Sequence, residues 1–216
     1  MKKTPKSRNT DNAQLRLWRG EFGNAYIERN SDAPEELQRR TRLLAAMLRC
    51  LAGAPPRSIL EVGANIGANL RALRALTAAE LYAVEPNAKA RERMVRGKVL
   101  PKSNVLDGIA SEIGLEDGAV ELSFTSGVLI HIHPDDLLAS CREIHRVSSR
   151  YVACAEYYSP RAEEVLYRGN KAAMFRRDFG GFWLDSFPDL RLVDYGFTWY
   201  RAGGPDDMNW WVFEKR

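Results

Sequence analysis

Cysteine is scarce in this chain, and the few that occur do not form a motif. Among 216 residues the cysteines are Cys50, Cys141 and Cys154, widely separated and without a Cys-x-x-Cys pair. An odd number of isolated cysteines argues against both a disulfide framework and a structural zinc site. We therefore expect no disulfide and no bound metal.

Long apolar runs are also missing. No segment is long enough to span a bilayer, and no charged start is followed by an apolar stretch of the signal-peptide kind. The sequence thus lacks support for membrane insertion or secretion, and we expect a cytoplasmic protein.

A basic surface is absent from most of the chain. Residues 1–50 hold 11 Lys and Arg against 6 Asp and Glu, whereas the remainder holds 21 against 22. The formal charge of +4 therefore comes from the first part of the chain. Residues 1–12 are predicted to be a disordered basic leader, with a nucleic-acid-binding arm as the alternative. Because residues 51–216 carry no basic excess, we expect no nucleic-acid partner.

The length and the pattern of the chain indicate one α/β domain over residues 13–216. Short apolar segments alternate with helical segments, which predicts a mostly parallel sheet with helices on both faces and ligands at the carboxyl ends of the strands. Residues 13–50 are expected to form a helical lid, and residues 157–185 an excursion beside the acceptor. Residues 190–197 and 209–214 are predicted to be a closing pair of strands.

The most informative stretch is residues 58–70. A buried strand is expected to end at Val62, and Gly63 and Gly67 allow a sharp turn with close approach of a ligand to the backbone. The following helix directs its unpaired N–H groups to the same place. The next strand ends at Glu85, where a ribose diol would lie.

This loop differs from phosphate-binding loops in two respects. It has no third glycine and no Walker lysine, so a pyrophosphate has less room and no cation. Glu61 stands just before the first glycine, and its charge would repel phosphate. A cationic nucleoside ligand therefore suits the loop better.

Candidate acids and bases follow the other strands. Asp107 lies near the end of a predicted strand over residues 103–109. It either accepts a hydrogen bond from adenine or is an ordinary surface acid. His131, after the fourth strand, is our first candidate for a general base. The alternative is a packed histidine bonded to the backbone. Glu156 and Tyr157, at the end of the fifth strand, are second candidates.

Trp18, Phe22 and Tyr26 are spaced at i, i+4 and i+8 and share one side of a helix. They either cap the core or form a lid over the ligand, in which case Arg29 and Asn30 could donate to a carboxylate.

The carboxyl-terminal third combines arginines with aromatic residues. Arginine pairs bidentately with carboxylates, so this combination suits a small anionic acceptor. It also fits a solvated surface, or a peptide or RNA acceptor. The candidate acceptor residues are Tyr158, Arg168, Arg176, Arg177, Tyr200, Arg201 and Trp210.

Three motifs resemble those of class I S-adenosylmethionine-dependent methyltransferases. They are residues 61–67, residues 85–87 and residues 127–132. More narrowly, the chain resembles the pseudaminic acid biosynthesis-associated methylases. The residues that carry this second resemblance are Trp18, Phe22, Gly23, Tyr26, Arg29, Asn30, Glu156 to Tyr158, Tyr167 to Gly169, Arg176 to Phe179, Asp194 to Phe197, Asp206, Asp207, Trp210, Glu214 and Lys215.

The resemblance implies a Rossmann-like fold with a seven-stranded sheet, an antiparallel last strand and S-adenosylmethionine as methyl donor. It assigns to the donor site Trp18, Tyr26, Arg29, Glu61, Gly63, Asn65, Gly67, Glu85, Pro86, Asn87, Asp107, Gly108, Ile109, Ser126 and Gly127. His133 and Gly181 depart from the family pattern, which bears on contacts to the acceptor.

Two functions follow as expectations. The first is a methyltransferase acting on O or N of a small anionic metabolite, such as a nonulosonic-acid-type sugar or another carboxylated intermediate. The second is a non-catalytic protein that binds the donor or its product S-adenosylhomocysteine. A monomer or a homodimer is expected.

Overall fold

A computed structural model describes residues 13–216. The predicted basic leader, residues 1–12, lies outside the described residues.

Seven strands form one sheet in the order β3-β2-β1-β4-β5-β9-β8. The first five strands of this order are mutually parallel, whereas β9 runs antiparallel to both β5 and β8. This is the predicted sheet, with its last strand in the chain antiparallel. The strands are β1 (Ser58–Val62), β2 (Glu80–Val84), β3 (Val105–Leu106), β4 (Val120–Ser126), β5 (Ser148–Glu156), β8 (Leu190–Thr198) and β9 (Met208–Lys215).

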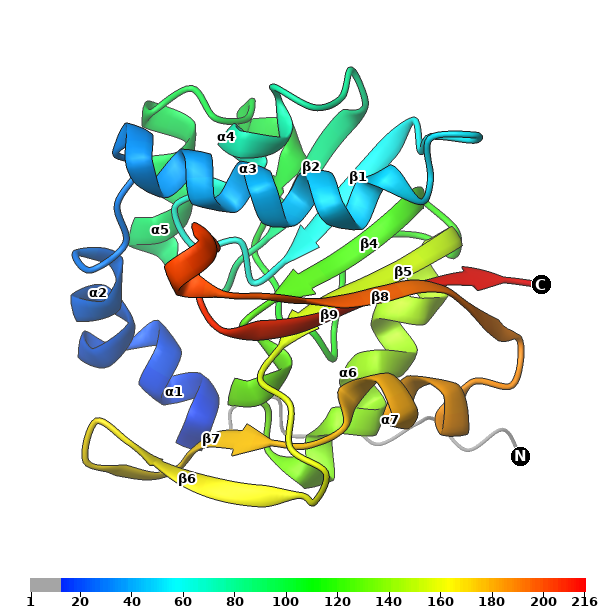
Figure 1. The fold of residues 1–216 in the computed structure, drawn as a ribbon. Helices are drawn as coiled ribbons and strands as arrows, with labels where there is room; N and C mark the ends of the chain where they lie inside the picture. Colours follow the sequence, from blue (N-terminus) through cyan, green and yellow to red (C-terminus); the bar gives the residue numbers. More distant parts are fainter. Residues whose placement is uncertain (1–12) are drawn as a thin grey trace, which may run out of the picture.

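Helices cover the sheet, and α3 and α6 lie on opposite sides of it (Figure 1). The helices are α1 (Ala13–Arg19), α2 (Glu21–Ile27), α3 (Pro34–Arg49), α4 (Ala68–Leu73), α5 (Ala88–Arg96), α6 (Pro134–Val147) and α7 (Phe179–Ser186), with 3-10 turns η1 (Lys102–Asn104), η2 (Leu129–His131) and η3 (Tyr200–Ala202). Because successive side chains of a strand point to opposite faces of the sheet, neighbouring residues pack in different hydrophobic cores. Ile59 packs with the α3 and α4 side, and Leu60 with the α6 and α7 side.

Residues 157–185 do leave the main sheet. They contain a separate antiparallel hairpin of β6 (Glu163–Tyr167) and β7 (Asn170–Arg176), and then most of α7. Helix α7 returns to the sheet through Trp183, which is fully buried. The hairpin lies below α1 and α2 in Figure 1, so both segments stand at the same end of the sheet.

The expected strand over residues 103–109 is much shorter in the structure. Only Val105 and Leu106 pair with β2, because the preceding residues form η1 and the following ones turn away. This edge of the sheet is therefore short, while the opposite edge is β8 with nine residues.

Candidate functional site

The turn after β1 adopts a conformation that favours glycine. Gly63 and Gly67 have φ of 77° and 78°, and Asn65 between them has φ of 49°. A Cβ atom on Gly63 would lie 2.6 Å from Cγ2 of Val128, so any side chain there meets the turn after β4. Gly63 N–H and Ala64 N–H both donate to the carbonyl of Val84, which fixes this loop to the end of β2.

A cavity of about 310 Å³ opens above this turn. Its walls come from α1 and α2, from the turns after β1, β2 and β4, from the segment after β3, and from α6. The predicted donor-site residues that line it are Trp18, Tyr26, Glu61, Gly63, Asn65, Glu85, Pro86, Asn87, Gly108, Ile109, Ser126 and Gly127. The predicted ligand side, at the carboxyl ends of the strands, is thus where the cavity lies.

Glu61 is the most unusual group in the cavity wall. Its side chain is 2% exposed, and its Oε1 accepts a hydrogen bond of 2.6 Å from Asn69. Asn69 in turn accepts from Arg40 at 2.9 Å. Oε2 of Glu61 is buried and has no hydrogen-bond partner among the described residues. Burial raises the pKa of Glu61 to about 8. A cationic ligand in the cavity would supply the counter-charge that this carboxyl group lacks.

Glu85 is held differently. Its two oxygens accept backbone N–H bonds from Asn65 at 2.7 Å and from Asn87 at 2.8 Å. Burial still raises its pKa above the ordinary value. Asn87 caps α5 with its side-chain oxygen, and its amide group donates to the carbonyl of Trp18 at 3.0 Å. Through Asn87, Glu85 is therefore connected to the amino-terminal helices.

The aromatic residues do not share one helix as expected, because the chain breaks at Gly20: Trp18 belongs to α1, and Phe22 and Tyr26 belong to α2. Their rings still cluster, and Trp18 and Tyr26 line the cavity. The ring of Trp18 lies 5.3 Å from Phe22 and 5.3 Å from Tyr26, both edge to face. The ring centroid of His131 lies 4.7 Å from that of Trp18 and 5.1 Å from that of Tyr167 in the hairpin. The two segments thus meet around His131.

His131 lines the cavity, and its Nδ1–H donates to the carbonyl of Ala173 at 2.6 Å. This bond leaves the lone pair on Nε2. Burial lowers the pKa of His131 to about 4, so the imidazole is neutral at physiological pH. Both sequence interpretations fit the geometry, since the ring is packed and bonded to the backbone and also borders the cavity.

Three predicted donor residues do not line the cavity. Arg29 lies over the ring of Phe22. Gly67 belongs to the turn, and its Cα faces the side chains of Met94 and Val99. Asp107 is more than half exposed and forms an ion pair of 2.9 Å with Arg91. Asp107 thus has the features of the second interpretation, an ordinary surface acid paired with a neighbouring arginine, and its contact with adenine stays a prediction.

The second candidates for a base are engaged elsewhere. Glu156 is fully buried and accepts from Thr125 at 2.8 Å and from the N–H groups of Val128, Leu129 and Ile130. It therefore holds the turn after β4, and its position does not support a role as a base. The hydroxyl of Tyr157 donates to Asp206, and Tyr157 is not among the cavity residues.

The predicted acceptor residues lie outside this cavity. Trp210 is 5% exposed and packs in the core on the α3 side. Tyr200 stacks under Arg39 at 4.2 Å, and Arg176 lies over Tyr157 at 5.6 Å. The remaining four acceptor candidates belong to the hairpin, its flanking segments and η3, and they do not line the cavity: Tyr158, Arg168, Arg177 and Arg201.

Sequence reasoning missed several cavity residues. Arg40 and Asn69 come from α3 and α4, and their meeting with Glu61 depends on helix packing. Asn69 lies eight residues after Glu61, at the start of the helix that follows the glycine turn, which is the one signal that could have found it. Other cavity residues that were not predicted include Ser111, Val128, Ile132, Asp136, Ala139 and Ser140.

Within residues 13–216, no cluster of acidic, histidine or cysteine side chains has the arrangement of a metal site. In the same range, no helix has the length and apolar character needed to cross a membrane.

Comparison with known proteins agrees with this geometry. Residues 60–151 match the family model of a methyltransferase domain. A search of curated proteins finds no significant match. Among solved structures, the chain is similar to 1,6-didemethyltoxoflavin-N1-methyltransferase of Burkholderia thailandensis, with bound S-adenosylhomocysteine, at a TM-score of 0.71 and 16% identity, covering 99% of this chain and 92% of that one.

A second similar structure is magnesium protoporphyrin IX methyltransferase of Synechocystis PCC 6803 with bound S-adenosylmethionine. Its TM-score is 0.68 at 13% identity, over 97% of this chain and 100% of that one. A third is the methyltransferase of Haloferax volcanii in complex with the activator Trm112, at a TM-score of 0.68 and 14% identity, over 91% and 96%. Residues 60–151 thus match a methyltransferase domain, and the chain has the fold of solved S-adenosylmethionine-dependent methyltransferases.

Proposed function

We propose that this enzyme moves a methyl group to an oxygen or nitrogen atom of a small anionic metabolite in the cytoplasm. A nonulosonic-acid-type sugar or another carboxylated biosynthetic intermediate is the acceptor class that fits best. This proposal follows the narrower resemblance to the pseudaminic acid biosynthesis-associated methylases.

The main support for placing the donor in this cavity is Oε2 of Glu61, which has no hydrogen-bond partner among the described residues. A buried carboxylate without a partner is costly unless a ligand completes its surroundings. Oε2 of Glu61 and Oδ1 of Asn65 lack partners among the described residues, and Nε of Arg40 lacks one as well. The two oxygen acceptors match an ammonium group and the arginine matches a carboxylate, so this set fits the two charged groups of an amino acid.

The other walls suit a nucleoside. Glu85 would hold the ribose hydroxyls, and Gly108 with Ile109 would lie along the adenine. When bound, the donor supplies an activated methyl group on a sulfonium centre. The residues of this chain orient the reactants and exclude water, and orientation alone can contribute roughly 7–11 kcal/mol to lowering a barrier.

Unpaired cations support an anionic acceptor. Arg168, Arg176 and Arg177 form no ion pair within residues 13–216. They belong to the hairpin and its return to the sheet, which meet the lid around His131. The absence of a basic excess in residues 51–216 speaks against RNA.

The test has two stages. Calorimetry should first detect binding of S-adenosylmethionine. Mass spectrometry should then detect a methylated product in a panel of acidic sugars, carboxylated metabolites and their neutral analogues. Methylation of the neutral analogues at equal rates would contradict an anionic acceptor. Donor binding without product from a small molecule, but with product from peptide or RNA, would contradict the small-molecule class.

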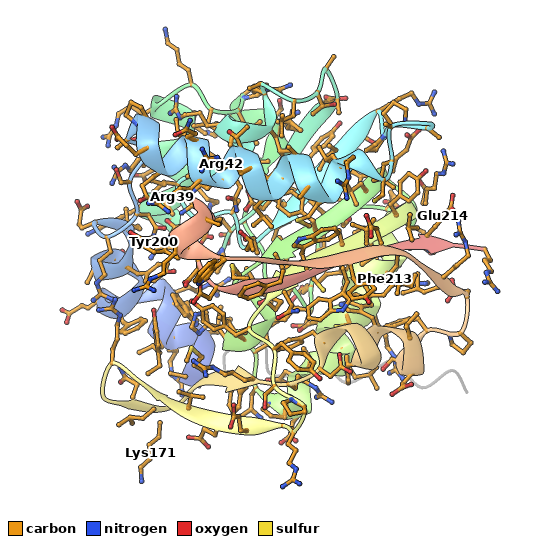
Figure 2. The ribbon with its side chains drawn as sticks, viewed as in Figure 1. Arg39, Arg42, Lys171, Tyr200, Phe213 and Glu214 are labelled. Atoms are coloured by element: carbon orange, nitrogen blue, oxygen red, sulfur yellow. The ribbon has the colours of Figure 1, made fainter. Side chains whose placement is uncertain are left out.

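Arg168→Ala is expected to weaken turnover of an anionic acceptor by roughly 10–100-fold in kcat/KM, since a hydrogen bond to a charged group contributes about 1.5–3 kcal/mol. Donor affinity should not change. Lys171→Ala is the matched control, because Lys171 is an exposed cation of the same hairpin that projects into solvent (Figure 2). Equal losses in both variants would mean that only the general charge of the hairpin matters.

His131→Gln is expected to lower kcat by roughly 10²–10⁴-fold if the imidazole is the base, with donor affinity retained. Because burial lowers its pKa to about 4, the wild-type rate should stay flat from pH 5 to pH 8 and fall only as the pH approaches 4. His145→Gln, in a histidine bonded to Asp189 away from the cavity, should leave kcat unchanged. An unchanged kcat in His131→Gln would make this residue a packing residue only.

A further inference from the structure

The side chain of Asn87 lies between the cavity and the two amino-terminal helices. Its Oδ1 accepts from the N–H of Ala90 at 3.2 Å and so caps α5. Its Nδ2 group donates to the carbonyl of Trp18 at 3.0 Å and to Oδ1 of Asn24 at 3.1 Å. Asn87 is 4% exposed, and both hydrogens of its amide group are directed at the helices.

The backbone of Asn87 is bound on the ligand side. Its N–H donates to Oε1 of Glu85 at 2.8 Å, and Oε2 of Glu85 accepts from the N–H of Asn65 in the glycine turn at 2.7 Å. Asn87 and Glu85 both line the cavity. A ligand hydrogen-bonded to Glu85 is therefore connected to α1 and α2 through this one residue.

The acceptors on the helices lie on the two sides of a break in the chain. Helix α1 ends at Arg19, so the carbonyl of Trp18 has no further N–H of α1 to accept from. Helix α2 begins after Gly20, which provides no side-chain cap. Asn87 thus supplies a hydrogen-bond donor that the end of α1 lacks, and its second donor reaches α2.

Gly23 allows this close contact. A Cβ atom at this position would lie 1.8 Å from the carbonyl oxygen of Trp18 and 3.0 Å from Nδ2 of Asn87. Because glycine has no Cβ atom, α2 can pass directly over the hydrogen bond between these two residues. Figure 1 shows α2 beside α5, the helix that Asn87 caps.

The apolar attachment of the two helices is small. Ile27 packs in a separate cluster with Ile66, Ala68 and Ala90, whereas no described residue of α1 or α2 belongs to either of the two main cores. Segments with few buried apolar contacts open more easily than a core does. The hydrogen bonds from Asn87 are therefore an important part of what holds these helices in place.

We propose that Asn87 is a positioning residue that couples the bound methyl donor to α1 and α2. The donor holds Glu85, Glu85 holds the backbone of Asn87, and the amide group of Asn87 holds Trp18 and Asn24, so that the helices close over the donor. Coupling of this kind is reciprocal, so loosening the helices weakens donor binding by the same factor. This inference rests on the placement of the donor in the cavity proposed above.

Asn24→Ala tests the coupling without touching the cavity, because Asn24 does not line it and Asn87 keeps its capping bond. In the wild type, S-adenosylmethionine should slow hydrogen exchange of the backbone amides in residues 13–27 and in residues 85–97. In Asn24→Ala the protection of residues 85–97 should remain, while the protection of residues 13–27 and the donor affinity should fall by roughly 2–10-fold, the usual net effect of one hydrogen bond. Glu21→Ala, at an exposed position of the same helix, is the control and should behave as the wild type.

Asn87→Asp breaks both bonds to the helices and keeps a good cap for α5. Its carboxylate would face the carbonyl of Trp18, so the donor-dependent protection of residues 13–27 should disappear and donor affinity should fall by roughly 5–50-fold. The double variant with Asn24→Ala should lose no more than Asn87→Asp alone, because both changes break the same link.

Two results would overturn the coupling alone: a wild type that binds the donor without protecting residues 13–27, or Asn87→Asp with full protection there. Losses that add in the double variant would do the same. A wild type that binds no donor would instead overturn the placement of the donor, and this inference with it.

Discussion

Gly63→Arg is expected to abolish binding of S-adenosylmethionine in a protein that still folds. The position has φ of 77°, and a Cβ atom there would lie 2.6 Å from Cγ2 of Val128. The rest of an arginine side chain has no space behind the turn and would extend into the cavity that Gly63 lines. Its charge would also repel the sulfonium and ammonium of the donor. Calorimetry should show no saturable heat.

The control for this variant separates strain from occlusion. Gly118 also has a positive φ, 65°, but it lies before β4, away from the cavity, and an added Cβ would make only ordinary contacts. Gly118→Ala should lose some thermal stability and keep full donor affinity. If Gly63→Arg is folded and binds the donor normally, the donor lies elsewhere.

Glu61→Gln is expected to weaken donor binding by roughly 10–100-fold, since a hydrogen bond to a charged group is worth about 1.5–3 kcal/mol. The substitution keeps the size of the side chain and can keep the contact with Asn69, which is 2.6 Å from Oε1 in the wild type. It removes the group that can become negatively charged when the cationic donor binds. The loss should therefore appear in donor affinity and leave the folded structure intact.

The pH dependence provides a second signature of Glu61. Burial raises its pKa to about 8, so the carboxyl group of the free protein is largely protonated at pH 7 and must lose a proton to attract the donor's ammonium. Affinity should therefore rise with pH up to about 8, with proton release that calorimetry in buffers of different ionisation enthalpy can detect. The rise must be absent in Glu61→Gln, and an identical profile in the two proteins would remove Glu61 from the site.

The position of the cavity could be predicted because its signals are local. Strand, glycine turn and helix follow one another within residues 58–73, and Glu85 ends the next strand. Parallel strands bring their carboxyl ends together wherever the chain alternates in this way, so the position of the cavity follows from the pattern. The clustering of Trp18 and Tyr26 was also predicted, although the two residues belong to the separate helices α1 and α2 and not to one helix.

Parts of the donor cavity and the acceptor side could not be predicted, because they depend on packing between distant segments. Arg40 reaches Asn69 from another helix, and Asp107 is drawn outward by Arg91. Which face of β9 carries Trp210 is decided by its pairing with Ala155 and by the core on the α3 side. The arginines of the hairpin were recognisable as a group, but no sequence pattern gives the direction of their side chains.

A calorimetric titration of the wild-type chain with S-adenosylmethionine, followed by displacement with S-adenosylhomocysteine, tests the central claim most directly. We expect one saturable site per chain, tighter near pH 8 than at pH 6, and competition between the two ligands. The absence of saturable binding, or binding that Gly63→Arg leaves unchanged, would contradict the placement of the methyl donor in this cavity.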